Sequence, residues 1–138
     1  MGAVRARDVL IRIGDGGAPE NFDDIGGLLA RTIALSARLV EATTAQSPQA
    51  WRELIAGSGT KRIELVGRGW FWDAVYDEKM RAAFFAGATP RFQLDVFGFG
   101  MFEGPFAIAE LNYGGESDDI TTFSMRLTSA GAISFTPE

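Results

Sequence analysis

The 138-residue sequence contains no cysteine and no histidine. Without cysteine the chain cannot have a disulfide framework, a thiol nucleophile or a zinc–thiolate site. Without histidine it lacks the usual general base near neutral pH and the commonest transition-metal ligand. Catalysis by carboxylate, lysine, serine or tyrosine side chains stays open. The two absences nevertheless disfavour an enzyme.

Long hydrophobic runs are absent as well. No apolar segment approaches the roughly 20 residues that a membrane-spanning helix needs. The N-terminal residues alternate like a strand and contain no apolar region of signal-peptide length. We therefore expect the chain to be made and assembled in the cytoplasm.

Basic residues are fewer than acidic ones, 13 against 18, which gives a net charge of −5. Tight binding to nucleic acid depends on lysine and arginine side chains that neutralise phosphates. The charge balance therefore disfavours a dedicated nucleic-acid-binding protein. It is compatible with a protein that must not stick to DNA.

Glycine and phenylalanine are plentiful, with 17 and 11 residues. Glycine at this level, without a G-X-Y period, indicates many tight turns, and phenylalanine favours pleated, half-buried surfaces. No linker or internal repeat interrupts the chain. We predict a single, mainly β domain over residues 1–138.

Two long alternating segments, at about residues 31–42 and 61–71, predict strands with one apolar and one polar face. Ile33 and Leu35 lie on the apolar face of the first segment, and Ile63 and Leu65 on that of the second. The predicted polar faces carry Thr32, Ser36 and Arg38 in the first strand, and Arg62, Glu64 and Arg68 in the second.

The connector between these strands, residues 43–59, contains Trp51, Leu54 and Ile55. Their spacing predicts a short amphipathic helical turn over residues 49–56. Two interpretations stay open for this connector. It is an arm that reaches a neighbouring subunit, or a loop folded back on its own core.

One helix is predicted after residue 72, with Asp73 or Asp77 as its N-cap and an apolar stripe of Met80, Ala83 and Phe84. Gly87 is suited to a left-handed C-cap, and Pro90 prevents continuation. The remaining segments alternate as strands, with a break predicted at Gly104–Pro105. About seven strands and one helix are typical of a β-sandwich or partly open barrel with a flanking α-helix.

No group of residues in the sequence forms a convincing active site, metal site or cofactor site. Residues 57–61 superficially resemble a phosphate-binding loop, but the required spacing is not met and a strand follows instead of a helix. The acidic pairs Asp23–Asp24 and Asp118–Asp119 fall in predicted loops and lack the EF-hand pattern.

Long strands with few protective residues leave sheet edges that can pair with another chain. A symmetric homo-oligomer would remove these edges. The alternative is a monomeric β-barrel that binds a small apolar ligand among its phenylalanines.

Several segments resemble the major tail proteins of long-tailed phages, in particular the branch that includes gene transfer agents. They are RDVLIRIGDG, GLLARTIALSARLVEATT, AWRELIAGSGTKRIELVGRGWF, MRAAFFAG, FEGPFAIAELNYGG and FSMRLTSAGAISFTP. The resemblance extends from about residue 4 to residue 137. Its most specific parts are the strand ARTIALSARLVEATT with the following WRELIAG, and the helix end AFFAG.

The resemblance implies a tail tube subunit that self-assembles into stacked hexameric rings. The rings would form a conduit for DNA in the tail of a virion or virion-like particle. Tape-measure, tail-terminator and distal tail proteins are implied as further partners. On this interpretation the six polar-face residues line the lumen, and the arm with Trp51, Leu54 and Ile55 joins neighbouring rings. Arg38 and Arg126 would make the lumen wall mixed in charge rather than uniformly acidic.

Overall fold

The structure is a computed structural model that describes residues 3, 5, 9–26, 28–55, 59–71 and 75–138. The described residues form ten strands, one α-helix and one short 3-10 segment. In chain order these are β1 (Val9–Gly14), β2 (Phe22–Asp24), β3 (Leu28–Ala37), β4 (Val40–Glu41), η2 (Pro48–Ala50), β5 (Leu54–Ile55), β6 (Lys61–Trp70), α1 (Val75–Ala86), β7 (Arg91–Val96), β8 (Gly100–Gly114), β9 (Thr122–Ser129) and β10 (Ser134–Pro137).

Eight of these strands form one antiparallel sheet in the order β2-β1-β7-β8-β9-β6-β3, with β10 added to β8. The sheet folds over at β8. Residues 100–105 of β8 pair with β7, whereas residues 106–114 pair with β9. β2, β1, β7, β10 and the first part of β8 therefore form one layer, and β3, β6, β9 and the rest of β8 form the other. The predicted fold class, a mainly β sandwich or partly open barrel with one helix, is confirmed.

The break predicted at Gly104–Pro105 is wrong, because β8 runs continuously through it. Proline has no N–H to donate to a ladder, so it usually interrupts one. Here the proline lies where β8 changes its partner strand. Its carbonyl oxygen accepts a hydrogen bond from the Ala130 N–H at 2.9 Å, and the next N–H, from Phe106, bonds to Pro90 at 3.0 Å.

The core lies between the two layers and is built from alternate residues of the strands. Phe92 and Phe106 are fully buried at its centre, with ring centroids 5.9 Å apart in an edge-to-face arrangement. The other core residues are Ile11, Ile13, Ile25, Leu28, Ile63, Leu65, Tyr76, Met80, Leu94, Phe102, Ile108, Phe123, Met125 and Leu127. The alternation predicted for β1 and β7 is confirmed by this set.

Helix α1 packs against β8, β1 and β2. Its buried residues include Tyr76 and Met80. Phe84 was predicted to belong to the buried stripe but is 45% exposed, so the prediction is wrong at this residue. Asp77 lies inside the first turn rather than at the cap, and Asp73 lies outside the described residues. Gly87 follows the helix with a φ of 66°, which confirms the predicted left-handed C-cap.

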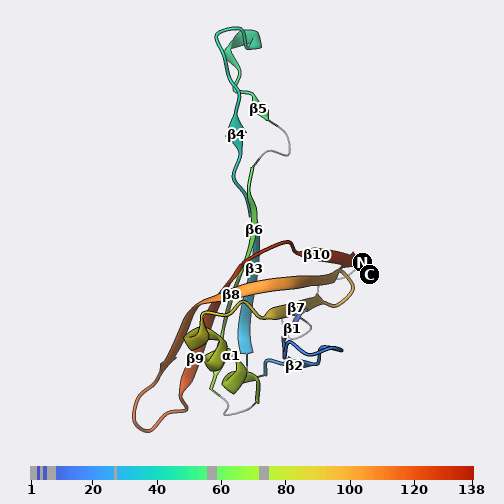
Figure 1. Cartoon of the computed structure of the whole chain (residues 1–138). Helices are drawn as coiled ribbons and strands as arrows, with labels where there is room; N and C mark the ends of the chain where they lie inside the picture. Colours follow the sequence, from blue (N-terminus) through green and yellow to red (C-terminus); the bar gives the residue numbers. More distant parts are fainter. Residues whose placement is uncertain (1–2, 4, 6–8, 27, 56–58, 72–74) are drawn as a thin grey trace.

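Strands β3 and β6 lead out of the body into a long two-stranded arm, about midway along which β4 and β5 pair (Figure 1). The predicted strand over residues 31–42 is interrupted after Ala37 and resumes as β4. The helical turn predicted over residues 49–56 is wrong, since Leu54 and Ile55 form β5. In a strand the adjacent residues Leu54 and Ile55 lie on opposite faces, so they do not share the single stripe that a helix would give.

Candidate assembly surfaces

The arm is a hairpin held by backbone hydrogen bonds along its length. Ala37 is paired with Lys61 at the end of the body, and the Arg38 N–H donates to the Thr60 carbonyl at 2.8 Å. Farther out, the Ala42 N–H donates to the Glu53 carbonyl at 2.8 Å. These bonds make the arm an extension of the sheet rather than a loop folded back on the core.

The tip of the arm is closed by side-chain hydrogen bonds and a tight turn. The Thr43 hydroxyl accepts the Glu53 N–H at 2.8 Å, and the Ser47 hydroxyl accepts the Thr44 N–H at 2.9 Å. In η2, Gln49 and Ala50 have φ values of 55° and 61°. Two consecutive positive φ values are those of a type I′ turn, which reverses a hairpin but is unfavourable for residues other than glycine or asparagine.

The three residues predicted for ring contacts all lie on the outer part of this arm. Trp51 follows the turn directly and is 70% exposed, while Leu54 and Ile55 are 41% and 49% exposed. Val40 is paired with Ile55 and Glu41 with Leu54, so the two β5 side chains lie on opposite faces of the hairpin. The arm therefore offers apolar groups on both faces, not the single stripe that helical spacing predicted.

Five of the six residues predicted for the lumen share one face of the four-stranded layer. The register pairs Ser36 with Arg62, and Arg68 with Ser124, and paired residues lie on the same face. Thr32 and Glu64 follow the same alternation. Arg38 lies beyond the end of β3, at the base of the arm.

The structure adds further polar residues to this face from β9 and β8. Arg126 pairs with Val66 of β6 on one side and with Glu110 of β8 on the other. The sequence alone did not place Glu110 and Asn112 here, because a bulge between Ile108 and Glu110 shifts the alternation of β8 by one residue. We call the set Thr32, Ser36, Arg62, Glu64, Arg68, Glu110, Asn112, Ser124, Arg126 and Thr128 the polar face.

Charges on the polar face are mixed and loosely paired. It carries three arginines and two glutamates, and the Arg126–Glu110 pair is long, at 3.9 Å. Both partners are half exposed, so the pair contributes little to stability. The polar face is thus mixed in charge, and that it lines a lumen stays a prediction.

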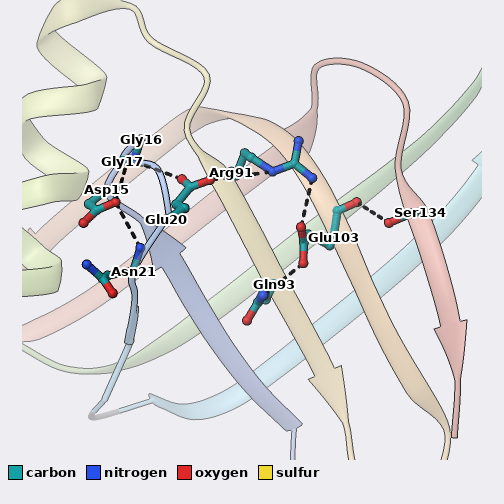
Figure 2. Close-up of polar contacts among 9 residues, drawn as sticks. All are labelled: Asp15, Gly16, Gly17, Glu20, Asn21, Arg91, Gln93, Glu103 and Ser134. Carbon is teal, nitrogen blue, oxygen red and sulfur yellow. Dashed lines mark hydrogen bonds and ion pairs between the residues drawn. The ribbon is translucent and has the colours of Figure 1, made fainter.

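The opposite layer carries a tighter network (Figure 2). Arg91 Nη2 lies 3.0 Å from Glu103 Oε2, and Arg91 Nε lies 3.8 Å from Glu20 Oε1. Gln93 Nε2 donates to the other Glu103 oxygen at 2.9 Å, and these donors, first Arg91 and then Gln93, hold the Glu103 pKa below its ordinary value. The Ser134 hydroxyl donates to the Glu103 carbonyl at 3.2 Å, which ties β10 to β8.

Asp15 organises the neighbouring turn. Its Oδ1 accepts the Gly17 N–H at 2.8 Å and the Asn21 N–H at 3.1 Å (Figure 2). These two donors lower the Asp15 pKa. The carboxylates of Asp15 and Glu103 already accept hydrogen bonds from groups within the chain. This network therefore stabilises the fold and is not a candidate binding site.

A buried carboxylate connects the helix to the body. Asp77 is almost fully buried and accepts a hydrogen bond from the Tyr113 hydroxyl at 3.0 Å. Its other oxygen lies 2.9 Å from Arg81 Nε without hydrogen-bond alignment, so that contact is mainly coulombic. Burial, with the Asp77 hydrogen bond second, raises the pKa of Tyr113 to about 12.

Several hollows lie on the surface of the described residues, and two of them are at opposite ends of the four-stranded layer. One, of about 580 Å³, is at the end of the layer away from the arm and is lined by Leu29, Trp70 and Tyr113 among others. The second, of about 460 Å³, lies at the base of the arm. The space between the layers is filled by side chains such as Phe92, Phe106 and Leu65.

Among the residues that the structure describes, no three His, Cys, Asp or Glu side chains are grouped so that they could hold a metal ion. No helix in the described part of the chain is long and apolar enough to cross a membrane.

Comparison with known proteins assigns the fold to a family. The family model described as phage tail tube protein matches residues 3–135. A search of curated proteins finds no match.

Solved structures agree with this assignment. A chain from the virion of a native gene transfer agent particle is 36% identical, with a TM-score of 0.87 over 97% of this chain and 99% of that one. A chain from the tail of an empty gene transfer agent particle, computed with C6 symmetry, is 37% identical, with a TM-score of 0.90 over the same shares. The SPP1 tail tube, at 12% identity, shares the fold, with a TM-score of 0.71 over 99% of this chain and 80% of that one. The chain therefore belongs to the phage tail tube protein family.

Proposed function

We propose that this protein forms hexameric rings that stack into a tail tube, with the polar face lining the lumen through which DNA passes. The role is structural rather than enzymatic. Assembly takes place in the cytoplasm, and the tube becomes part of a phage or phage-like particle. Tape-measure, tail-terminator and distal tail proteins are its further partners, and the DNA passes without specific binding.

The observation that carries this proposal is the four-stranded layer with its polar face. Within the described residues, the outer edge of β3 and the second part of β8 have no further strand partner in the sheet. Unpaired edges of this length are templates for pairing with another chain. With rotational symmetry, a free strand edge of each subunit can pair with its neighbour, and the ring closes without a free edge.

The mixed charge of the polar face suits transit of a polyanion. Arginines placed beside glutamates on this face provide no continuous basic track, which would hold DNA through many phosphate contacts. The net charge of −5 keeps the whole subunit acidic, and like charge disfavours binding. The proposal thus depends on the balance of charge rather than on a uniformly acidic wall.

Cysteine labelling tests the position of the polar face, because the native chain has no cysteine. Thr32→Cys lies on the polar face, and Thr136→Cys lies on β10 of the other layer; both threonines are exposed in the subunit. A maleimide reagent too large to enter the tube should label both variants as free subunits. In assembled tubes it should label only Thr136→Cys. Equal labelling of the two variants in tubes would contradict a lumen-facing polar face.

A further inference from the structure

The hollow at the base of the arm has an apolar floor and a basic rim. Its apolar lining residues, which we call the floor, include Leu35, Ala37, Ile63 and Ile133, and its basic lining residues are Lys61 and Arg62. Leu35 is 62% exposed although it lies on the core side of β3. The floor is thus an apolar surface that the isolated chain leaves uncovered.

The positive charges around this hollow are not neutralised by the chain itself. Arg38, Lys61 and Arg62 have no carboxylate partner among the described residues, and Arg62 Nε donates to the Ser36 hydroxyl at 3.1 Å. Three cations are therefore gathered where the arm leaves the body. We call the hollow beside these cations the arm-root hollow.

The loop between β8 and β9 has the opposite character and lies at the opposite end of the body from the arm (Figure 1). It carries Glu116, Asp118 and Asp119, none of which pairs with a cation among the described residues. Ile120, next to these acids, is 62% exposed. The loop is shaped by a hydrogen bond from the Asp119 N–H to the Glu116 carbonyl at 3.0 Å.

We propose that the β8–β9 loop of one copy docks in the arm-root hollow of a second copy in the adjoining ring. This inference rests on the proposed function, because head-to-tail stacking brings the arm end of each subunit against the opposite end of the next. Three carboxylates then face three cations, and Ile120 covers the apolar floor. Opposite charges fix the register of such a contact and suppress the reversed orientation.

The arm itself does not occupy this hollow. Extended strands rise about 3.3 Å per residue, so residues 38–44, which precede the turn at the tip, carry the tip roughly 20 Å from the arm root. In the proposed stack, Trp51 at the tip therefore meets the next body beyond the joint between the two ends. The arm root and the β8–β9 loop are left to meet each other.

Charge reversal tests the contact. Lys61→Glu with Arg62→Glu should raise the subunit concentration needed for tube formation at least about tenfold, and Asp118→Lys with Asp119→Lys should do the same. The four changes together should restore assembly, because the charges face each other again in exchanged positions. Tube formation is followed by light scattering and negative-stain microscopy, and thermal melting of the free subunits confirms that each variant folds. Glu78→Lys, on the exposed side of α1, is the matched control and should assemble normally.

The outcomes separate the two proposals. If the wild type forms tubes and the reversed variants form them equally well, the docking contact is wrong and the tube function stands. If the combined variant assembles no better than the two reversed pairs, the pairing of loop and hollow is also wrong. If the wild type forms neither rings nor tubes even with a nucleating tail complex, the tube function itself fails.

Discussion

The Cα of Gly59 lies against the backbone carbonyl of Arg38, so that a Cβ at residue 59 would overlap the carbonyl oxygen. The overlap is with backbone, which cannot move aside as a flexible side chain would. This contact is at the base of the arm, next to the hydrogen bond from the Arg38 N–H to Thr60. The direction in which the arm leaves the body thus depends on a glycine.

Gly59→Ala should therefore separate the two arm strands at their base. We expect a loss of stability larger than the roughly 1 kcal/mol of an average substitution, and a failure to form tubes. Amide hydrogen exchange at Arg38 and Ala42 measures the opening of the arm. Gly26→Ala, where a Cβ would meet nothing within 4 Å, is the control and should behave like the wild type. Unchanged exchange in Gly59→Ala would show that the arm root tolerates the methyl group.

Trp51→Ala should weaken tube formation without unfolding the subunit. Trp51 is exposed on the arm, so its removal costs the subunit little, whereas large aromatic side chains contribute much of the energy at interfaces. The melting temperature of the free subunit and the yield of tubes in sedimentation measure the two effects. Phe85→Ala, at an exposed aromatic residue on α1, is the control. A Trp51→Ala variant that polymerises as the wild type does would exclude the arm as the ring contact.

Tyr113 should remain protonated well into the alkaline range. Its pKa is about 12 in the folded protein against 10.0 ordinarily, so the stabilisation is complete below pH 10 and is lost as the pH rises through 12. The sequence has two tyrosines, and burial also raises the pKa of Tyr76. Tyrosinate absorbance during an alkaline titration should therefore rise late for both. A normal titration of either tyrosine would contradict the burial seen here.

Tyr113→Phe removes the hydroxyl that donates to Asp77. A buried carboxylate that loses a donor typically costs about 1–3 kcal/mol, so we expect a lower free energy of unfolding by urea. Asp77→Asn keeps the shape but removes the charge, and combining it with Tyr113→Phe should cost less than the sum of the two single changes. Simple additivity would show that the two groups do not interact.

Glu103→Gln should flatten the loss of stability in acid. The Glu103 pKa lies below its ordinary 4.5, so the carboxylate stabilises the fold above that pH and the contribution is lost as the pH falls through the lowered pKa. Melting temperatures of the two proteins between neutral pH and about pH 3 should converge as the pH falls. Curves that stay parallel over this range would show that the pair with Arg91 does not contribute.

Leu65→Ala should be among the most destabilising single changes. Leu65 is fully buried at the centre of β6, and leucine-to-alanine changes in a packed core typically cost about 2–5 kcal/mol. Leu29→Ala, at an exposed leucine of β3, makes the same chemical change and should cost less than about 0.5 kcal/mol. Urea unfolding of both variants gives the comparison, and similar costs would contradict the packing described here.

Local patterns explain why much of the fold could be predicted. Alternation predicted the strands that contain Ile11, Phe92 and Leu65, and Gly87 marked the end of the helix, because each pattern is set by neighbours in the chain. The predictions are wrong where a strand partner far away in the sequence determines the local structure. β8 continues through Pro105 because the strand changes partner there, and residues 54–55 are a strand because β4 pairs with them.

The residues of the polar face were likewise predictable only where the pattern is local. The polar alternation of β3 and β6 showed that Arg62, Glu64 and Arg68 share one face, because side chains of a strand alternate whatever the fold. Alternation could not place Glu110 on this face, because the bulge in β8 shifts the pattern by one residue. A bulge is defined only against a partner strand, so the sequence of β8 alone does not reveal it.

The sequence by itself determined the chemistry: a β-rich chain without cysteine or histidine, with polar strand faces and an apolar-tipped connector. Only the tertiary structure decided that this connector is a hairpin arm, and that a basic hollow and an acidic loop lie at opposite ends of the body. The physical reason is that strand pairing joins residues far apart in the chain. Their relative positions therefore follow from the folded sheet and not from any local pattern.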